Sequence, residues 1–251
     1  MSFELVCEVE PPTKPDLKPV RHQIGVMSRI ASAFLIPDNH LGRATVSSIA
    51  VAHEVEAMGG RSIACLNSRD RNLLGFRRDL LTAAAYGVDQ FLLVHGDAPA
   101  AGARTSQLTV HQMIDEVRAF PSDQPFRAGA VSGLRPVPEW KRTADFLFVQ
   151  MSFSLDALLR WRDTCDVSVP VYAGVLVVAS ERMAKGLRDG VAALDIPDDL
   201  VAAVERDRTA GVEFACQHVL AIRDSGAFDG VHLVPVSRYR EVAARLERDL
   251  V

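Results

Sequence analysis

The stretch from residue 62 to residue 97 constrains the fold of this chain most, because it reads as two strands joined by one helix. Two short apolar runs flank a stretch with apolar residues at helical spacing, and these segments cover 62–66, 73–85 and 90–94. Gly87 supplies a residue that ends the helix. The pattern predicts a parallel β-α-β unit, with polar loops at 67–72 and 95–97 after the two strands.

The same alternation repeats along the whole chain. We expect strands at 3–10, 33–36, 62–66, 90–94, 126–131, 145–151, 169–178 and 230–236. We expect helices at 20–32, 44–58, 73–85, 109–120, 155–164, 180–194, 198–224 and 238–250, with only a turn or two within 134–144. Eight strands alternating with helices predict an α/β fold, a single (β/α)8 TIM barrel domain over residues 1–251. An open doubly wound sheet is the alternative, but the first strand is not followed by a GxGxxG turn.

Local residue choices support several of these boundaries. Thr109, Ser154 and Ser237 precede apolar-periodic stretches and belong to the residue types favoured at helix N-caps. Pro11 and Pro12 end the first strand, because proline has no amide hydrogen to donate to a neighbouring strand.

Composition excludes several classes of protein. With 48% hydrophobic and 24% charged residues, the chain has the composition of a globular protein rather than a disordered one. A net charge of −4 gives no basic field for nucleic acid. No apolar run approaches the roughly 20 residues that span a bilayer, and no signal segment is present. We therefore expect a cytoplasmic protein with neither nucleic acid nor a membrane as partner, and nothing in the sequence indicates an oligomeric state.

Cysteine and histidine spacing indicates no metal centre. The four cysteines are Cys7, Cys65, Cys165 and Cys216. They form no CxxC pair, so buried free thiols are favoured over a zinc site or a disulfide framework. The histidines within expected helices, which we interpret as solvated or packed side chains, are His22, His53, His111 and His218. No HxH or HxxxH spacing occurs, so no metal ligands are assigned.

In a TIM barrel, active-site groups lie where strands end at the C-terminal rim. That rule selects Glu8, Glu10, Asp38, Asn39, His40, Cys65, Asn67, His95, Asp97, Ser132, Gln150 and Ser152. Glu8 and Glu10 lie two residues apart on a strand and share a face. A carboxyl group near a barrel interior is costly to ionise, which suits a general acid. The alternative for each carboxylate is a helix cap or an ion pair, and Arg69, Asp70 and Arg71 are equally consistent with a loop ion-pair cluster.

These strand ends resemble the methylenetetrahydrofolate reductase family. Cys7-Glu8-Val9-Glu10-Pro11-Pro12 resembles the signature that opens those enzymes, a glutamate shortly before two prolines. Further segments that resemble the family in order and spacing are Asp38-Asn39, Arg69-Asp70-Arg71-Asn72, Gly96-Asp97-Ala98-Pro99, Phe126-Arg127-Ala128-Gly129, Gln150, Ile196-Pro197-Asp198-Asp199-Leu200 and residues 211–236. The resemblance therefore spans nearly the whole chain.

The resemblance implies reduction of 5,10-methylenetetrahydrofolate to 5-methyltetrahydrofolate in one-carbon metabolism and methionine biosynthesis. Hydride would come from NAD(P)H, usually through bound FAD. Glu8 would protonate the folate amine as the methylene bridge opens, and Asp97 would stabilise the developing positive charge. Substrate contacts implied by position are those of Gln150, Glu10, Asp38, Asn39, Ser132 and Phe153. Cofactor contacts implied by position are those of Cys65, Asn67, Asp70, Asn72 and His95.

Three departures from the family concern the flavin. Cys65-Leu66-Asn67-Ser68 replaces the family's His-Leu-Thr-Cys, the segment after Asp97 lacks the family's tyrosine-containing contacts, and the loop and helix after the fifth strand are reduced to 134–143. We therefore expect either weak flavin binding or a flavin-independent enzyme that takes hydride directly from NAD(P)H. The alternatives are a non-catalytic folate-binding or subunit-stabilising barrel and a pterin-dependent methyltransferase barrel, although the sequence carries no metal or corrinoid motif.

Overall fold

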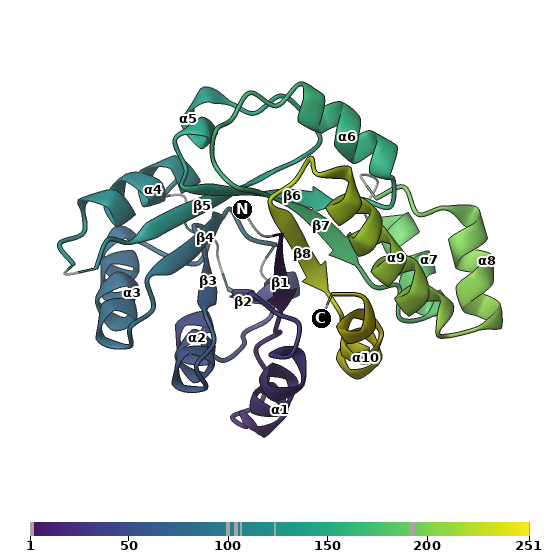
Figure 1. The fold of residues 1–251 in the computed structure, drawn as a ribbon. Coiled ribbons are helices and arrows are strands. Elements are labelled where there is room, and N and C mark those ends of the chain that lie inside the picture. Colours follow the sequence, from purple (N-terminus) through teal and green to yellow (C-terminus); the bar gives the residue numbers. More distant parts are fainter. Residues whose placement is uncertain are drawn as a thin grey trace.

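The structure, a computed structural model, describes residues 3–98, 101–102, 105, 107–122, 124–190 and 194–250. In this part of the chain eight parallel strands pair in sequence order, and β1 pairs with β8 to close a barrel (Figure 1). The strands are β1 (Glu4–Glu8), β2 (Ala33–Ile36), β3 (Ser62–Asn67), β4 (Gln90–Val94), β5 (Arg127–Ser132), β6 (Phe146–Met151), β7 (Val171–Leu176) and β8 (Gly230–Val234). The expected (β/α)8 barrel is confirmed.

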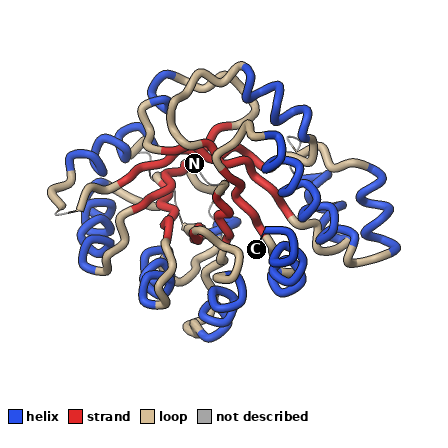
Figure 2. The backbone as a smooth tube through the Cα atoms, in the orientation of Figure 1, coloured by secondary structure: helices blue, strands red, loops and turns tan. Residues whose placement is uncertain are grey.

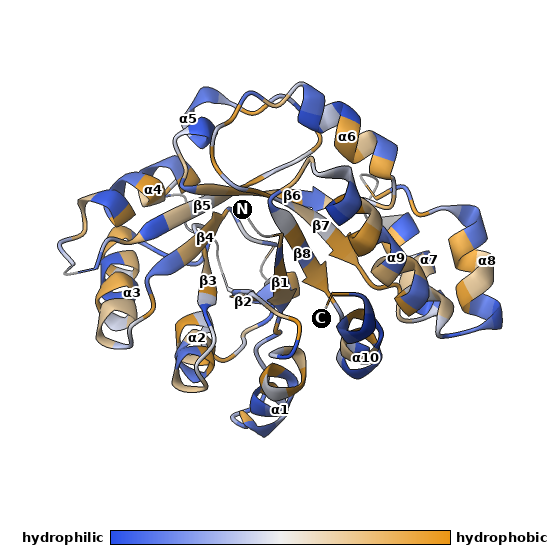
Figure 3. Cartoon of the chain, viewed as in Figure 1, coloured by the Kyte–Doolittle hydropathy of each residue, from blue (hydrophilic) through white to orange (hydrophobic). Residues whose placement is uncertain are grey.

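Helices surround the strands (Figure 2). They are α1 (Lys18–Met27), α2 (Ser48–Ala57), α3 (Leu73–Ala85), α4 (Val110–Ala119), α5 (Glu139–Arg142), α6 (Leu155–Asp163), α7 (Glu181–Gly190), α8 (Asp198–Arg206), α9 (Ala210–Ser225) and α10 (Tyr239–Leu250), with a 3-10 turn η1 (His40–Gly42). The strands are mostly apolar, whereas the helices carry apolar and polar residues on different faces (Figure 3). Among the described residues, none of these helices combines the length and the apolar character needed to cross a membrane.

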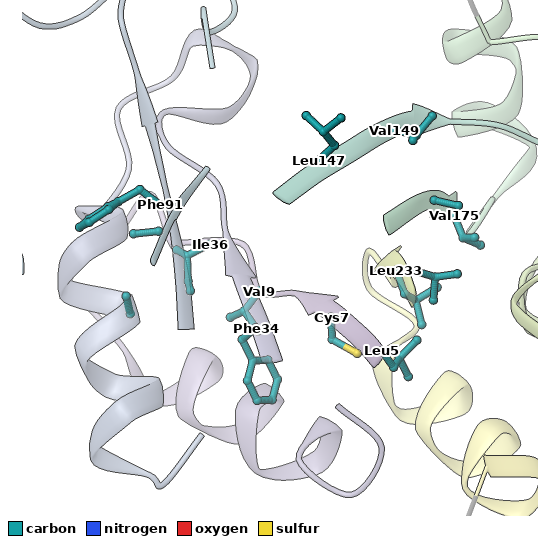
Figure 4. Packing of buried hydrophobic residues seen from close by; sticks show 14 of the residues in the cluster. Leu5, Cys7, Val9, Phe34, Ile36, Phe91, Leu147, Val149, Val175 and Leu233 are labelled. Atoms are coloured by element: carbon teal, nitrogen blue, oxygen red, sulfur yellow. The ribbon is translucent and has the colours of Figure 1, made fainter. Parts of the chain in front are cut away.

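Alternation of side chains along each strand produces two apolar regions. One set points outward and packs beneath the helices, as do Leu5 and Cys7 of β1 and the adjacent Val9 (Figure 4). The other set fills the barrel interior and includes Val6, Leu35, Cys65, Phe146, Phe148 and Tyr172. Residues at even positions of β1 therefore face the interior, which directs Glu8 toward the barrel mouth.

A polar cluster links distant strands at the amino-terminal end of the barrel. The hydroxyl of Tyr172 donates to Oε2 of Glu4 at 2.5 Å, and Nη2 of Arg61 donates to Oε1 of Glu4 at 2.6 Å. Burial tends to raise the pKa of Glu4, but these two hydrogen bonds outweigh it and leave that pKa below its usual value. Burial, aided by Glu4, raises the pKa of Tyr172. The cluster thus ties the first strand to the seventh.

The register between β6 and β7 shifts within the barrel wall. Phe148 pairs with Tyr172 and Met151 pairs with Gly174, so β6 carries one extra residue between these pairs. A Cβ atom on Gly174 would lie 2.7 Å from the carbonyl oxygen of Val149 and 2.8 Å from the amide nitrogen of Met151. Only glycine permits this close approach of the two strands at the bulge.

Most expected helices are present, but some boundaries differ. The helix expected at 44–58 begins at Ser48, and the stretch expected at 198–224 is divided where Asp207 accepts hydrogen bonds from the amide and hydroxyl of Thr209. The N-caps at Thr109 and Ser154 are confirmed, whereas the last helix begins at Tyr239, two residues after Ser237. The expected helix end at 191–193 and Pro99 lie outside the described residues.

Candidate functional site at the carboxyl ends of the strands

Asp38, which follows β2, gathers groups from the β3 loop. Its Oδ2 accepts hydrogen bonds from the amide nitrogen of Asn67 at 3.0 Å, from Nδ2 of Asn67 at 2.7 Å, and from Arg71. Arg71 also donates to Oδ2 of Asp79 at 2.8 Å. The Asp38 side chain is 5% exposed and that of Arg71 is 12% exposed, so this is a buried ion pair. Arg71 therefore forms ion pairs, but with Asp38 and Asp79 rather than within the Arg69-Asp70-Arg71 stretch.

Asn39 and Asp70 extend the same network. Oδ2 of Asp70 accepts from Nδ2 of Asn39 and from Nδ2 of Asn67, both at 3.0 Å. The amide nitrogen of Asp70 donates to Oδ1 of Asn67 at 2.9 Å. Four residues that the sequence divides between substrate and cofactor, Asp38, Asn39, Asn67 and Asp70, are therefore joined in one hydrogen-bonded unit that fixes two loops.

Asp97 is held by the backbone of the neighbouring loop. Its Oδ2 accepts a hydrogen bond from the amide of Leu41 at 2.9 Å. Asn39 and Leu41 both adopt left-handed backbone conformations, with φ of 48° and 55°, which are uncommon for residues other than glycine. Gly96 has a φ of 90°, and a Cβ there would lie 2.8 Å from Cβ of Asn67. The loops after β2, β3 and β4 are therefore closely packed, and the Asp97 side chain is exposed at the rim.

Glu8 lies at the carboxyl end of β1 beside a histidine that the sequence analysis did not select. Its Oε2 is 3.2 Å from Nε2 of His232 on β8, and the two side chains are 15% and 8% exposed. Nε2 of His232 has no aligned hydrogen-bond partner among the described residues, so the contact rests on proximity and charge. The signal that could have identified His232 is its position as a lone polar residue in an apolar strand. Glu10, two residues beyond Glu8, is exposed.

Cys65 of β3 packs in the barrel interior. Burial raises the pKa of the Cys65 thiol well above its usual value, and the negative charges of Glu8 and Asp38 raise it further. The thiol therefore stays protonated at neutral pH and packs as a small apolar group. All four cysteines are buried and free, as expected.

The remaining candidates occupy separate positions. Ser132 is buried and its hydroxyl donates to the carbonyl oxygen of Gly133 at 3.1 Å, and the half-buried Gln150 lies beside Gly133. Asn72 caps α3 by accepting a hydrogen bond from the amide of Gly75 at 2.8 Å. Phe153 packs in an apolar cluster with residues of α7 and α8. Asn72 and Phe153 therefore have local structural roles in this conformation.

A cavity of about 880 Å³ opens next to the rim between β4, β5, α4 and α5. Its polar lining includes the exposed His95, whose Nδ1 lies 3.3 Å from Oγ of Ser68. His111 stacks on Trp140, with ring centroids 5.5 Å apart. Nζ of Lys141 donates to the carbonyl oxygen of Val131 at 2.6 Å, and burial lowers the pKa of this lysine. Trp140 and Lys141 belong to α5, the short helix in the segment 134–143 that is reduced relative to the family.

The fold and the rim define a TIM-barrel protein whose polar groups converge at the carboxyl ends of the strands. The chain belongs to the methylenetetrahydrofolate reductase family, whose model matches residues 2–248. A search of curated proteins found no match.

Solved structures share the fold at low sequence identity. An uncharacterized protein from Clostridium thermocellum that binds two copies of 5-methyl-5,6,7,8-tetrahydrofolic acid has a TM-score of 0.64 and 12% identity, covering 99% of this chain and 96% of that chain. EDTA monooxygenase from Chelativorans sp. BNC1 has a TM-score of 0.59 and 11% identity, covering 100% and 93%. Tryptophan synthase from M. tuberculosis has a TM-score of 0.53 and 13% identity, covering 99% and 93%. At these identities the similarity shows the barrel fold alone.

Proposed function

We propose that this chain catalyses the NAD(P)H-dependent reduction of 5,10-methylenetetrahydrofolate to 5-methyltetrahydrofolate. Membership of the reductase family supports the class of reaction. The observation that carries the proposal concerns Glu8. Its carboxyl group is partly buried at the barrel mouth, and no described residue donates an aligned hydrogen bond to it. A carboxyl group that no protein donor occupies can hydrogen-bond directly to a substrate nitrogen, as a general acid must.

The proposed reaction begins with Glu8 in its acid form. Glu8 donates its proton to the folate amine as the bond between that nitrogen and the methylene carbon breaks, which leaves an iminium cation on the other nitrogen. Asp97, exposed at the rim, stabilises this cation electrostatically. The nicotinamide supplies a hydride to the methylene carbon, which becomes the methyl group. One proton from solvent then restores the acid form of Glu8, so each turnover consumes one hydride and one proton.

The cavity beside His95 offers more groups suited to a nucleotide than the hydrogen-bonded unit of Asp38, Asn39, Asn67 and Asp70 does. Its walls include Trp140 and apolar side chains for a ring, together with the Lys141 amine and the amino-terminal end of α4 for a phosphate. In contrast, Asn67 and Asp70 already hydrogen-bond to Asp38 and Asn39. We therefore propose that NAD(P)H occupies the cavity and donates hydride directly, without bound FAD.

A second candidate is a folate-binding barrel that does not catalyse reduction. The protein from Clostridium thermocellum, which has a similar fold, is described only as binding 5-methyltetrahydrofolic acid. The two candidates differ in a single prediction, because only the enzyme oxidises NADH when methylenetetrahydrofolate is added.

A Glu8→Gln variant tests the proposed acid. We expect kcat for NADH oxidation to fall by about 10²- to 10⁴-fold, with folate affinity nearly unchanged, because glutamine keeps the shape but has no acidic proton to give. Glu247→Gln on α10 is the matched control, since it alters an exposed carboxylate remote from the rim.

Three outcomes would contradict parts of the proposal. Full turnover by Glu8→Gln would remove Glu8 from the chemistry. Wild-type protein that binds folate but never oxidises NADH would support the non-catalytic barrel. A stoichiometric flavin absorption spectrum in freshly purified protein would show that direct transfer from NAD(P)H is wrong.

A further inference from the structure

We propose that His232 is the positioning residue for Glu8, holding its carboxyl group at the barrel mouth and delivering the proton that restores its acid form. This inference rests on the proposed function, because it assumes that Glu8 is the acid. It assigns a role to the last strand of the barrel, in which the sequence analysis found no site residue.

Barrel closure is what brings the two side chains together. β1 and β8 pair in parallel, with Val6 opposite His232, so the inward-facing Glu8 lies one step further toward the mouth on the neighbouring strand. Oε2 of Glu8 and Nε2 of His232 are 3.2 Å apart. The His232 ring meets the edge of Phe148 at a centroid distance of 5.3 Å and an interplanar angle of 81°, which restricts its rotation.

The other groups around Glu8 do not compete for this role. Gln23 of α1 donates to the backbone carbonyl oxygen of Glu8 at 3.0 Å rather than to its carboxyl group. Cys65 of β3 faces Glu8 as a protonated thiol, because burial and nearby negative charge raise its pKa. Within the described residues, His232 is the basic side chain found within ion-pair distance of Glu8.

Imidazole suits this task better than a guanidinium group would. Arginine remains charged throughout the working pH range and does not give its proton to a carboxylate. Imidazole exists in charged and neutral forms near neutral pH. When Glu8 has given its proton to the folate amine, protonated His232 can pass the proton on Nε2 to the carboxylate and take another from solvent. The net uptake remains one proton for each turnover.

Two variants separate proton delivery from packing. We expect His232→Leu to lower kcat by about 10- to 100-fold while KM for folate changes little, because a charge-assisted contact to the acid is lost. His232→Gln keeps a hydrogen-bond donor at nearly the same reach but has no proton to give, so it should recover the part of kcat that comes from positioning and not the part that comes from proton delivery. His53→Gln on the exposed face of α2 is the control. A kcat in His232→Leu within about twofold of wild type, or full recovery of kcat in His232→Gln, would overturn the inference.

A second measurement does not depend on activity. In protein labelled with ¹⁵N-histidine, Glu8→Gln should shift the ring-nitrogen resonances of His232 and leave those of His53 in place. If His232 does not respond, the pairing is absent in solution and the inference fails, even if the protein reduces folate. If His232 responds in a protein without reductase activity, the pairing stands and the proposed function fails.

Discussion

Asp38 and Glu8 are both carboxylates at the barrel mouth, but they receive very different contacts. Asp38 accepts three hydrogen bonds, one of them from a buried guanidinium group. Within the described residues, the Glu8 carboxyl group has one ion-pair contact, with the imidazole of His232. A carboxylate oxygen that accepts several hydrogen bonds is fixed by the protein, whereas a proton donor needs an oxygen that is free to contact the substrate. The same residue type therefore serves structure at one strand end and is available for chemistry at another.

Replacing Asp38 by asparagine tests its structural role. We expect the free energy of unfolding to fall by about 2–4 kcal/mol, because Arg71 would keep its charge in a buried site with only Asp79 opposite it. Urea unfolding followed by tryptophan fluorescence measures this change. Glu54→Gln, which breaks the more exposed ion pair with Arg21, is the control and should cost much less. Equal losses of unfolding free energy in the two variants would show that the buried Asp38 network stabilises the protein no more than an exposed ion pair does.

The bulge between β6 and β7 depends on Gly174. We expect Gly174→Ala to lower the free energy of unfolding by about 1–3 kcal/mol, because the new methyl group would press on the backbone of Val149 and Met151. It should also weaken folate binding if Gln150, which lies in the bulge, contacts the substrate.

A matched glycine lies outside the barrel wall. A Cβ on Gly186 in α7 would meet nothing within 4 Å, so Gly186→Ala should raise the free energy of unfolding by about 0.5–1 kcal/mol through helix propensity. Destabilisation by both variants, measured by urea unfolding, would show that backbone contact at Gly174 is not the cause.

The strands and most helices could be predicted because each is encoded by a local apolar pattern, as in 62–66 and 90–94. The bulge opposite Gly174 could not, since it arises from the pairing of two strands. The turn at His40–Gly42 was also missed, and its Leu41 amide donates to Asp97, which is distant in sequence. The same limit applies to the site. Glu8 was identified because it lies at a strand end, but His232 comes close to Glu8 only through the pairing of β8 with β1.

The closed barrel also has an acid-sensitive contact at its other end. Because the pKa of Glu4 is lowered in the folded protein, the ionised carboxylate stabilises the barrel above its unfolded-state pKa, and this stabilisation is lost as pH falls through the folded-state pKa.

Between about pH 6 and pH 3, wild-type protein should therefore lose more unfolding free energy than Glu4→Gln. The difference should range from a few tenths to about 1 kcal/mol, since solvent screens a carboxylate that is 29% exposed. Urea unfolding at a series of pH values measures it. Parallel losses in the two proteins would show that the Tyr172 and Arg61 contacts do not govern acid stability.

Pairing of β1 with β8 also determines when the site can form during synthesis of the chain. A ribosome adds about 5–20 residues per second, so Glu8 is synthesised on the order of 10 s or more before His232, almost the whole chain later. Until the eighth strand emerges, the acid has neither its imidazole nor a closed wall behind it. A nascent chain that stalls before that point carries every other rim residue but no assembled proton donor, so the chemistry proposed for this barrel is the last property that synthesis confers on it.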